Sequence, residues 1–290
     1  MSPLNAESLD EIKENFSNTY HSGSNALMIF TSQDLISGGN YTLEDKNELK
    51  LYSIPYIHHF KNASWYNYFV KFALGYSSYI EDGEVGGPFE KSRLLVETYA
   101  ARVGVGVRFK TEYNLDFILS TSFIYSYTNG DFNYGSQELK DTLSPVDSIL
   151  NSSYNNYTSE ITAGAAYHKI IADYKPYATF DASIFHTSSS FELADYTIQS
   201  YYLKLKAGVI TPPLVTLYDI PIKLEGYFAQ SHLNGEMSDI FSVENYSVLG
   251  TTFHLDATRY NEYISELYIN FNILRGHNIE GYNYGIGASF

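Results

Sequence analysis

Apolar and polar residues alternate with period two along most of this chain, which indicates β-strands rather than helices. The segment 97–109 illustrates the pattern, because one face is apolar and the other carries charges and glycines. The apolar face holds Tyr99, Ala101, Val103, Val105, Val107 and Phe109, and the opposite face holds Arg102, Gly104, Gly106 and Arg108. The alternation predicts twelve strands, at 24–33, 47–58, 65–79, 91–109, 113–127, 155–170, 174–188, 197–210, 214–230, 242–255, 262–274 and 279–290.

The connections between these strands alternate in length. If the C-terminus lies on the periplasmic side, the outer connections are 34–46, 80–90, 128–154, 189–196, 231–241 and 275–278, and the periplasmic ones are 59–64, 110–112, 171–173, 211–213 and 256–261. Five of the six outer connections exceed every periplasmic one. Long loops on one side and tight turns on the other are typical of outer-membrane proteins. The sequence therefore predicts an all-β fold, a twelve-stranded antiparallel transmembrane β-barrel.

Composition is compatible with such a barrel. The 290 residues suit one barrel, and 29 Tyr supply rings that are stable at a membrane interface. The mean hydropathy is only -0.22, as expected when alternate residues face lipid. An Arg or Lys facing lipid near the midplane costs about 2–4 kcal/mol. The charged strand faces are therefore predicted to line the lumen.

The last strand points to a cellular location. Tyr282, Tyr284, Ile286, Ala288 and Phe290 alternate with small or polar residues, and the sequence ends on Phe. This ending resembles the assembly signal of bacterial outer-membrane barrel proteins, carried here by Phe290, Tyr284 and Ile286. No signal peptide follows Met1. We therefore expect the mature form of a Gram-negative outer-membrane protein, with lipid, lipopolysaccharide and the barrel-assembly machinery as partners.

One convincing helix, 5–16, precedes the strands. Asn5 can cap it, and Leu9, Ile12 and Phe16 fall on one face. A helix followed by twelve strands resembles the translocator domain of autotransporters, in which a helix lies inside the pore. Almost nothing precedes this helix, so the expected type is a solitary translocator-like barrel without a passenger. The expected division is a helix and linker at 1–23 and a barrel at 24–290.

The charges on the helix and on the strands predict that the helix lies in the lumen. It carries Glu7, Asp10, Glu11 and Glu14. The inward faces carry the basic residues Lys71, Arg102, Arg108, Lys204, Lys206 and Lys223, and the acidic residues Asp116, Glu160, Asp181, Glu225 and Glu266. We predict that the basic wall residues pair with the acidic helix. The alternative is that wall charges pair across strands. Inward glycines, among them Gly104, Gly106, Gly164 and Gly208, are expected to leave room for the helix.

Candidate catalytic chemistry is weak. Ser231, His232, Asn234 and Gly235 resemble part of the catalytic sequence of outer-membrane phospholipase, but no Ser occupies the position two residues after the His. The adjacent His58 and His59 point to opposite strand faces, so we expect no metal site there. We expect no enzyme and no cofactor. The net charge of -15 argues against nucleic-acid binding. The acidic outer loops could hold divalent cations or could serve only for solubility.

Three functions remain open at this point. The first is a structural, surface or narrowly gated role for a barrel occluded by its own helix. The second is a passive channel for small solutes, selective for anions through its lumen bases. The third, a barrel lipase or protease, has the least support.

Overall fold

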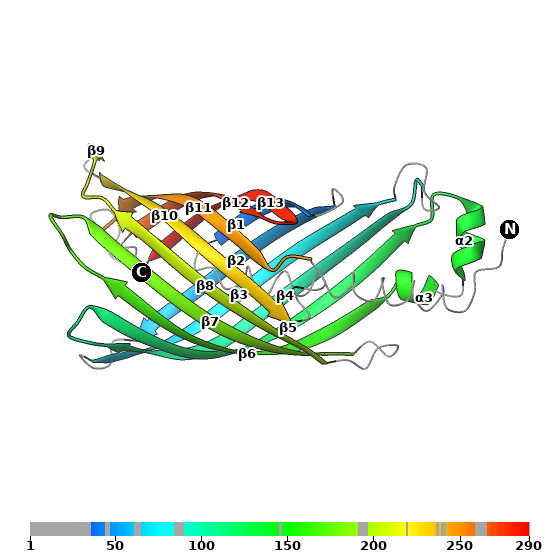
Figure 1. Ribbon diagram of the computed structural model, residues 1–290, viewed down its shortest axis with the longest axis horizontal. Coiled ribbons are helices and arrows are strands. Elements are labelled where there is room, and N and C mark those ends of the chain that lie inside the picture. The colour runs from blue at the N-terminus through cyan, green and yellow to red at the C-terminus, as the bar shows by residue number, and fades with distance from the viewer. Residues whose placement is uncertain are drawn as a thin grey trace.

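A closed antiparallel barrel forms the body of the protein (Figure 1). The computed structural model describes residues 36–43, 47–60, 65–83, 90–144, 147–190, 197–218, 220–235, 238, 242–258 and 266–289. Its strands are β1 (Ile36–Leu43), β2 (Glu48–Phe60), β3 (Tyr66–Asp82), β4 (Arg93–Lys110), β5 (Leu115–Asn133), β6 (Ser153–His168), β7 (Lys175–Ser189), β8 (Thr197–Ile210), β9 (Val215–Leu217), β10 (Ile220–Gly235), β11 (Asn245–Asp256), β12 (Glu266–Gly276) and β13 (Ile279–Ser289). Twelve of them make the ring. The short strand β9 pairs only with the first three residues of β10.

The ring closes through β1, which pairs with β13 on one side and β2 on the other. Gly38 faces Tyr284 in one neighbour and Tyr52 in the other. The sequence placed this segment in the first outer connection, 34–46, and that placement is wrong. The alternation is weak here because β1 reads ISGGNYTL, with two glycines where strand-forming side chains are expected. The predicted strand 24–33 and the predicted helix 5–16 lie outside the described residues.

The predicted strand 214–230 also needs correction. The chain forms β9, turns, and returns antiparallel as β10, so that Val215 pairs with Ile222. Tyr218 at the turn has a φ of 49°. A non-glycine residue in the left-handed region ends a strand. The sequence missed this turn because apolar residues continue on both sides of it.

The two ends of the barrel differ. We call the end that carries α2 (Gln137–Leu143) and α3 (Asp147–Leu150) the helical end, and the other the turn end. The connections 83–92 and 134–152 lie at the helical end, as predicted. The difference in connection length between the two ends is smaller than the sequence suggested. The helical-end connection 44–47 is short, and the turn-end connection 257–265 is long. β3 and β5 also extend into the predicted outer loops, over 80–82 and 128–133.

The outward face of the wall is apolar and exposed. Side chains such as Leu119 and Leu205 are exposed to 51% and 55%. Aromatic rings gather towards each edge of this surface. At the helical side, the ring centroids of Tyr52 and Tyr76 are 6.1 Å apart and those of Tyr76 and Tyr99 are 5.0 Å apart. Towards the turn end, Trp65 and Phe109 stack at 6.1 Å. The predicted faces of 97–109 are confirmed, with Tyr99, Val103, Val105 and Phe109 outside.

The inward face is not uniformly polar, which the sequence did not predict. Near the helical end it is an apolar core, in which Leu49, Val96 and Leu233 are nearly inaccessible to solvent. A belt of hydroxyl groups follows, with Thr98 bonded to Thr128 at 3.0 Å and Thr158 to Thr187 at 2.8 Å. The charged residues come after this belt, towards the turn end. Alternation alone could not order these layers, because strand stagger decides which inward residues meet at one level.

The segment 134–152 is folded rather than an open loop. Ser136 caps α2 by accepting a hydrogen bond from the Leu139 backbone N–H at 3.2 Å. Leu143 and Leu150 are buried in the apolar core. Asn151 accepts a hydrogen bond from the backbone N–H of Phe132 at 2.8 Å, which fastens the segment to β5. No helix among the described residues is long and apolar enough to cross a bilayer.

A contact between Tyr134 and Asp147 holds this segment, and it predicts a pH dependence. The hydrogen bond that the Tyr134 hydroxyl donates lowers the pKa of Asp147 below its usual 3.8, and burial raises the pKa of Tyr134 to about 12. The contact's contribution to stability is therefore present above the usual pKa of Asp147 and is lost as the pH falls through the lowered value. Tyr134→Phe should move the pKa of Asp147 back up towards 3.8, measured by carboxyl carbon NMR titration. An unchanged titration would contradict the contact.

Candidate functional site: the barrel lumen

All six predicted lumen bases lie on the inward face of their strands. Arg102 and Arg108 come from β4, Lys204 and Lys206 from β8, Lys71 from β3 and Lys223 from β10. Four of them form ion pairs with acidic residues of the wall. The pairs are Arg102 with Glu160, Arg108 with Asp116 at 2.7 Å, Lys206 with Glu225 at 3.0 Å and Lys223 with Glu266 at 3.8 Å. Lys204 lies directly across from Asp181 in the β7–β8 register.

The Glu225 carboxylate is the centre of the larger network. It accepts hydrogen bonds from the Tyr177 hydroxyl, from Lys206 and from His254 Nε2, the last at 2.9 Å. The other ring nitrogen of His254 lies 3.6 Å from Glu266. The network thus links strands β7, β8, β10, β11 and β12. Because each buried carboxylate has several partners, the burial of charge here is compensated.

A chain of contacts between uncharged side chains extends this network to β1, where the ring closes. The Lys206 ammonium lies 3.7 Å from the centre of the Tyr227 ring, a cation–π contact. Tyr227 donates to Asn272, which bonds Asn283, which in turn donates to the Tyr41 hydroxyl at 3.3 Å. Strands from the middle of the chain are thereby tied to β1, the strand that closes the ring.

The smaller network lies on the opposite part of the wall. Arg102 and Glu160 pair across β5, and their side chains are 4% and 2% exposed. The Thr162 hydroxyl donates to Glu160 at 2.8 Å. Lys71 donates to Ser120 at 2.8 Å. A pair this deeply buried is stable only when both members are present.

The partners of these bases within the described residues are therefore largely wall groups. The acidic helix residues Glu7, Asp10, Glu11 and Glu14 lie outside the described part of the chain, and their pairing stays a prediction. A Cβ added at Gly104 would meet Ser122, at Gly106 the Phe69 ring, and at Gly208 the Tyr177 ring. These glycines make room for neighbouring wall side chains, and the prediction that they also leave room for the helix stays a prediction.

Two cavities of about 230 and 370 Å³ lie in the lumen. Arg108, Asp181 and Lys204 line both. Both cavities are therefore lined by basic and acidic groups. Glu160 adds a second carboxylate to the smaller one. A lumen that selects strongly for anions needs an excess of positive charge. The paired charges along this wall give little such excess.

The remaining candidates are not brought together. Ser231 faces inward and lies 3.2 Å from the Tyr202 hydroxyl, whereas His232 bonds Asn245 at 2.9 Å on the other face. His58 packs on Phe60 and His59 on Phe69, on opposite faces as expected. Within the described ranges, no three His, Asp or Glu residues gather as metal ligands. Tyr284 and Ile286 are exposed on the outward face of β13, and Phe290 lies outside the described residues.

Sequence reasoning missed the aromatic members of the network. Tyr177, Tyr227 and His254 all lie on inward faces, so the alternation gave their direction. It gave no sign that they would bond Glu225, Lys206 and Glu266, because those contacts join strands far apart in the chain.

The structure defines a twelve-stranded barrel with an apolar outer wall and a charge-paired lumen. No protein-family model and no curated protein matches this sequence. Solved structures do match its fold. The translocator domain of the autotransporter NalP from Neisseria meningitidis has a TM-score of 0.62 and 9% identity, covering 94% of this chain and 100% of that one.

Two further translocators are similar. The β-domain of the Bordetella autotransporter BrkA has a TM-score of 0.58 and 10% identity over 88% of this chain and 96% of its own. The transport unit of AIDA-I from Escherichia coli has a TM-score of 0.50 and 14% identity, covering 95% and 97% of the two chains. The predicted resemblance to autotransporter translocator domains is confirmed at the level of fold.

The Arg102–Glu160 pair predicts a large effect of breaking it. Arg102→Gln should lower the free energy of unfolding by about 3–5 kcal/mol, because it leaves a buried carboxylate without its partner. The double variant R102M/E160M should recover most of that loss. Urea titration of the refolded protein measures both.

The matched control is Arg93→Gln. Arg93 and Asp82 are 3.7 Å apart with side chains 54% and 75% exposed. Such a pair contributes about 0–1 kcal/mol at most. Equal losses in R102Q and R93Q would contradict the central role of the buried pair.

Proposed function

We propose that this protein is an integral β-barrel of the bacterial outer membrane, of the translocator type. The observation that carries the proposal is the pairing of an exposed apolar outer wall with a buried, charge-paired lumen. A water-soluble barrel would place exposed residues such as Leu205, Phe180 and Phe253 inside. A closed barrel also pairs the edges of all its strands. A bilayer requires this, because its interior offers no water to satisfy unpaired backbone groups.

The first test is a charge on the outer wall. Leu205→Arg should cost about 2–4 kcal/mol of folding free energy in lipid vesicles, because the guanidinium would face hydrocarbon. Tyr113→Arg is the control, since Tyr113 is 82% exposed in a turn-end connection. Urea unfolding, followed by the heat-dependent gel shift of folded barrels, measures both. Equal stability of the two variants would count against a membrane-spanning wall.

We further propose that the N-terminal helix expected at 5–16 occludes the lumen. Side chains can fill the interior of a barrel of about eight strands, and a wider ring needs other material. Yet inward groups at the hydroxyl belt, such as Thr98, Thr128 and Ser200, are fully buried. The small volumes of the two lumen cavities, about 230 and 370 Å³, also support a filled lumen rather than an open pore.

Conductance tests this occlusion. In planar bilayers the intact chain should show little single-channel conductance, and a variant lacking residues 1–22 should conduct several-fold more. Replacing Glu7, Asp10, Glu11 and Glu14 together by Gln should give an intermediate rise if their charges seat the segment. High conductance of the intact chain would instead favour the passive channel, our second candidate.

An outer-membrane hydrolase is the third candidate. Lipase and protease assays on the refolded protein separate it from the other two, because neither a plugged barrel nor a channel turns over substrate. The opposite orientation of Ser231 and His232 gives no support to acyl transfer at that position.

A further inference from the structure

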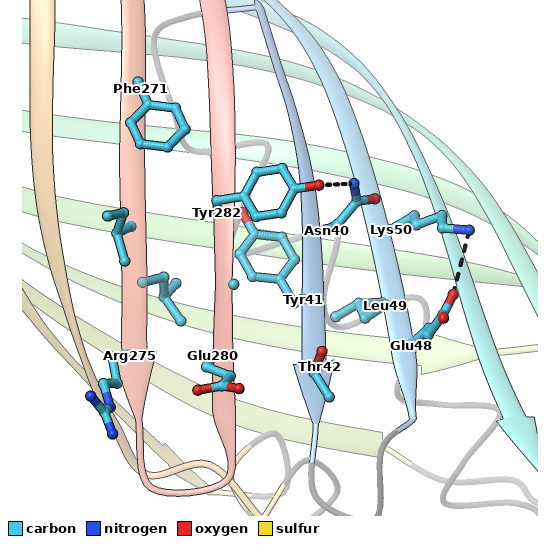
Figure 2. Close-up of a pocket in the computed structure, with 13 residues that line it drawn as sticks. Asn40, Tyr41, Thr42, Glu48, Leu49, Lys50, Phe271, Arg275, Glu280 and Tyr282 are labelled. Atoms are coloured by element: carbon cyan, nitrogen blue, oxygen red, sulfur yellow. Dashed lines mark hydrogen bonds and ion pairs between the residues drawn. The ribbon is translucent and has the colours of Figure 1, made fainter.

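A groove of about 780 Å³ runs over β1 on the outside of the barrel, at the helical end (Figure 2). We propose that it binds a phosphorylated glycolipid, an acylated disaccharide with a phosphate on each sugar, which is the chemistry of lipid A. This inference rests on the proposed membrane location. It adds a specific lipid site at the seam of the barrel, which ordinary contact with lipid does not require.

The groove exists because β1 has short side chains on its outward face. Asn40 and Thr42 form the floor, between β13 and β2, and the groove ends at Gly38. A Cβ at Gly38 would lie 3.0 Å from the Tyr52 ring and 3.6 Å from the Tyr284 ring, so the two walls meet over this glycine. Further up, the Asn40 amide donates to the Tyr282 hydroxyl at 3.2 Å.

The register arranges the lining in rows of decreasing polarity. The row nearest the helical end is charged, the next is mixed, and the following rows are aromatic and then aliphatic. Across β12, β13, β1 and β2 the two rows that line the groove are Arg275, Glu280, Thr42 and Glu48, then Ile273, Tyr282, Asn40 and Lys50. The third row is Phe271, Tyr284, Gly38 and Tyr52, of which Phe271 lines the groove and the others continue the wall beyond it. Phe271 and Tyr284 are exposed, as are Ile269 and Ile286 below them. This order matches a lipid lying along the wall, with its headgroup at the helical end.

The spacing of the two cations favours a headgroup with two phosphates. Arg275 lies on β12 and Lys50 on β2, three strand spacings apart, or about 14 Å. Between them lie a hydroxyl, an amide and a carboxylate, which suit sugar hydroxyls. A disaccharide with a phosphate at each end would engage both cations at once. A phospholipid with a single phosphate would engage only one.

Each cation has a carboxylate neighbour, Glu280 across from Arg275 in the β12–β13 register and Glu48 beside Lys50. Glu48 is 3.5 Å from Lys50, and the two side chains are 60% and 40% exposed. Such an exposed pair is weak and can rearrange when a phosphate arrives. It also gives a test of opposite sign, because removing the Glu48 charge should strengthen phosphate binding.

The experiment uses the full chain refolded in detergent. Diphosphoryl lipid A is titrated and retention is followed by native mass spectrometry, with monophosphoryl lipid A and phosphatidylglycerol as comparison lipids. The double variant K50Q/R275Q should bind diphosphoryl lipid A at least tenfold more weakly, and Glu48→Gln should bind it more tightly. The control K110Q/K175Q removes two exposed lysines at the turn end and should bind like the unaltered chain.

Each outcome has a separate meaning. Equal retention of the two lipid A forms, or equal weakening by the groove and control variants, overturns the site. Folding is checked by the heat-dependent gel shift, so a variant that does not fold is replaced by the single variants K50Q and R275Q. If the unaltered chain fails to insert into vesicles, the proposed function itself fails. If it inserts but does not distinguish the lipids, only the site is wrong.

Discussion

The closed ladder of backbone hydrogen bonds is the constraint on which the rest of this structure depends. Every ring strand has a partner on both sides, so no edge is left to pair with another chain or to lie unsatisfied in lipid. Closure requires β1, although Ile36–Leu43 is short and contains two glycines. Its neighbours β13 and β2 hold it in place. The groove over β1 follows from this choice of a strand with small outward side chains.

Closure also sorts the side chains into two environments. Residues that alternate along each strand become an outer surface and a lumen, with opposite demands on polarity. The outer surface is apolar over most of its height, with charged side chains such as Lys50 and Arg275 near the helical end. The lumen is not uniform: it passes from an apolar core beneath α2 and α3, through a hydroxyl belt, to the charged networks. Each layer draws its members from strands far apart in the chain.

The lumen charges stabilise the wall more clearly than they prepare it for a ligand. Glu225 and Glu160 are each held by basic and hydroxyl partners from neighbouring strands. Removing one member of such a group leaves a buried charge uncompensated, whereas the complete group has little charge to offer a passing ion. This balance argues against a lumen that selects strongly for anions.

The sequence by itself determined most strand positions and the direction of nearly every side chain, because period-two alternation is a local property. It placed Arg102, Lys206 and Glu225 in the lumen correctly. It could not find β1, whose pairing depends on ring closure, nor the turn at Tyr218. Only the tertiary structure decided that Arg102 meets Glu160, that Tyr177 and His254 converge on Glu225, and that Lys50 and Arg275 flank one groove. Those contacts depend on stagger between strands, which no single strand encodes.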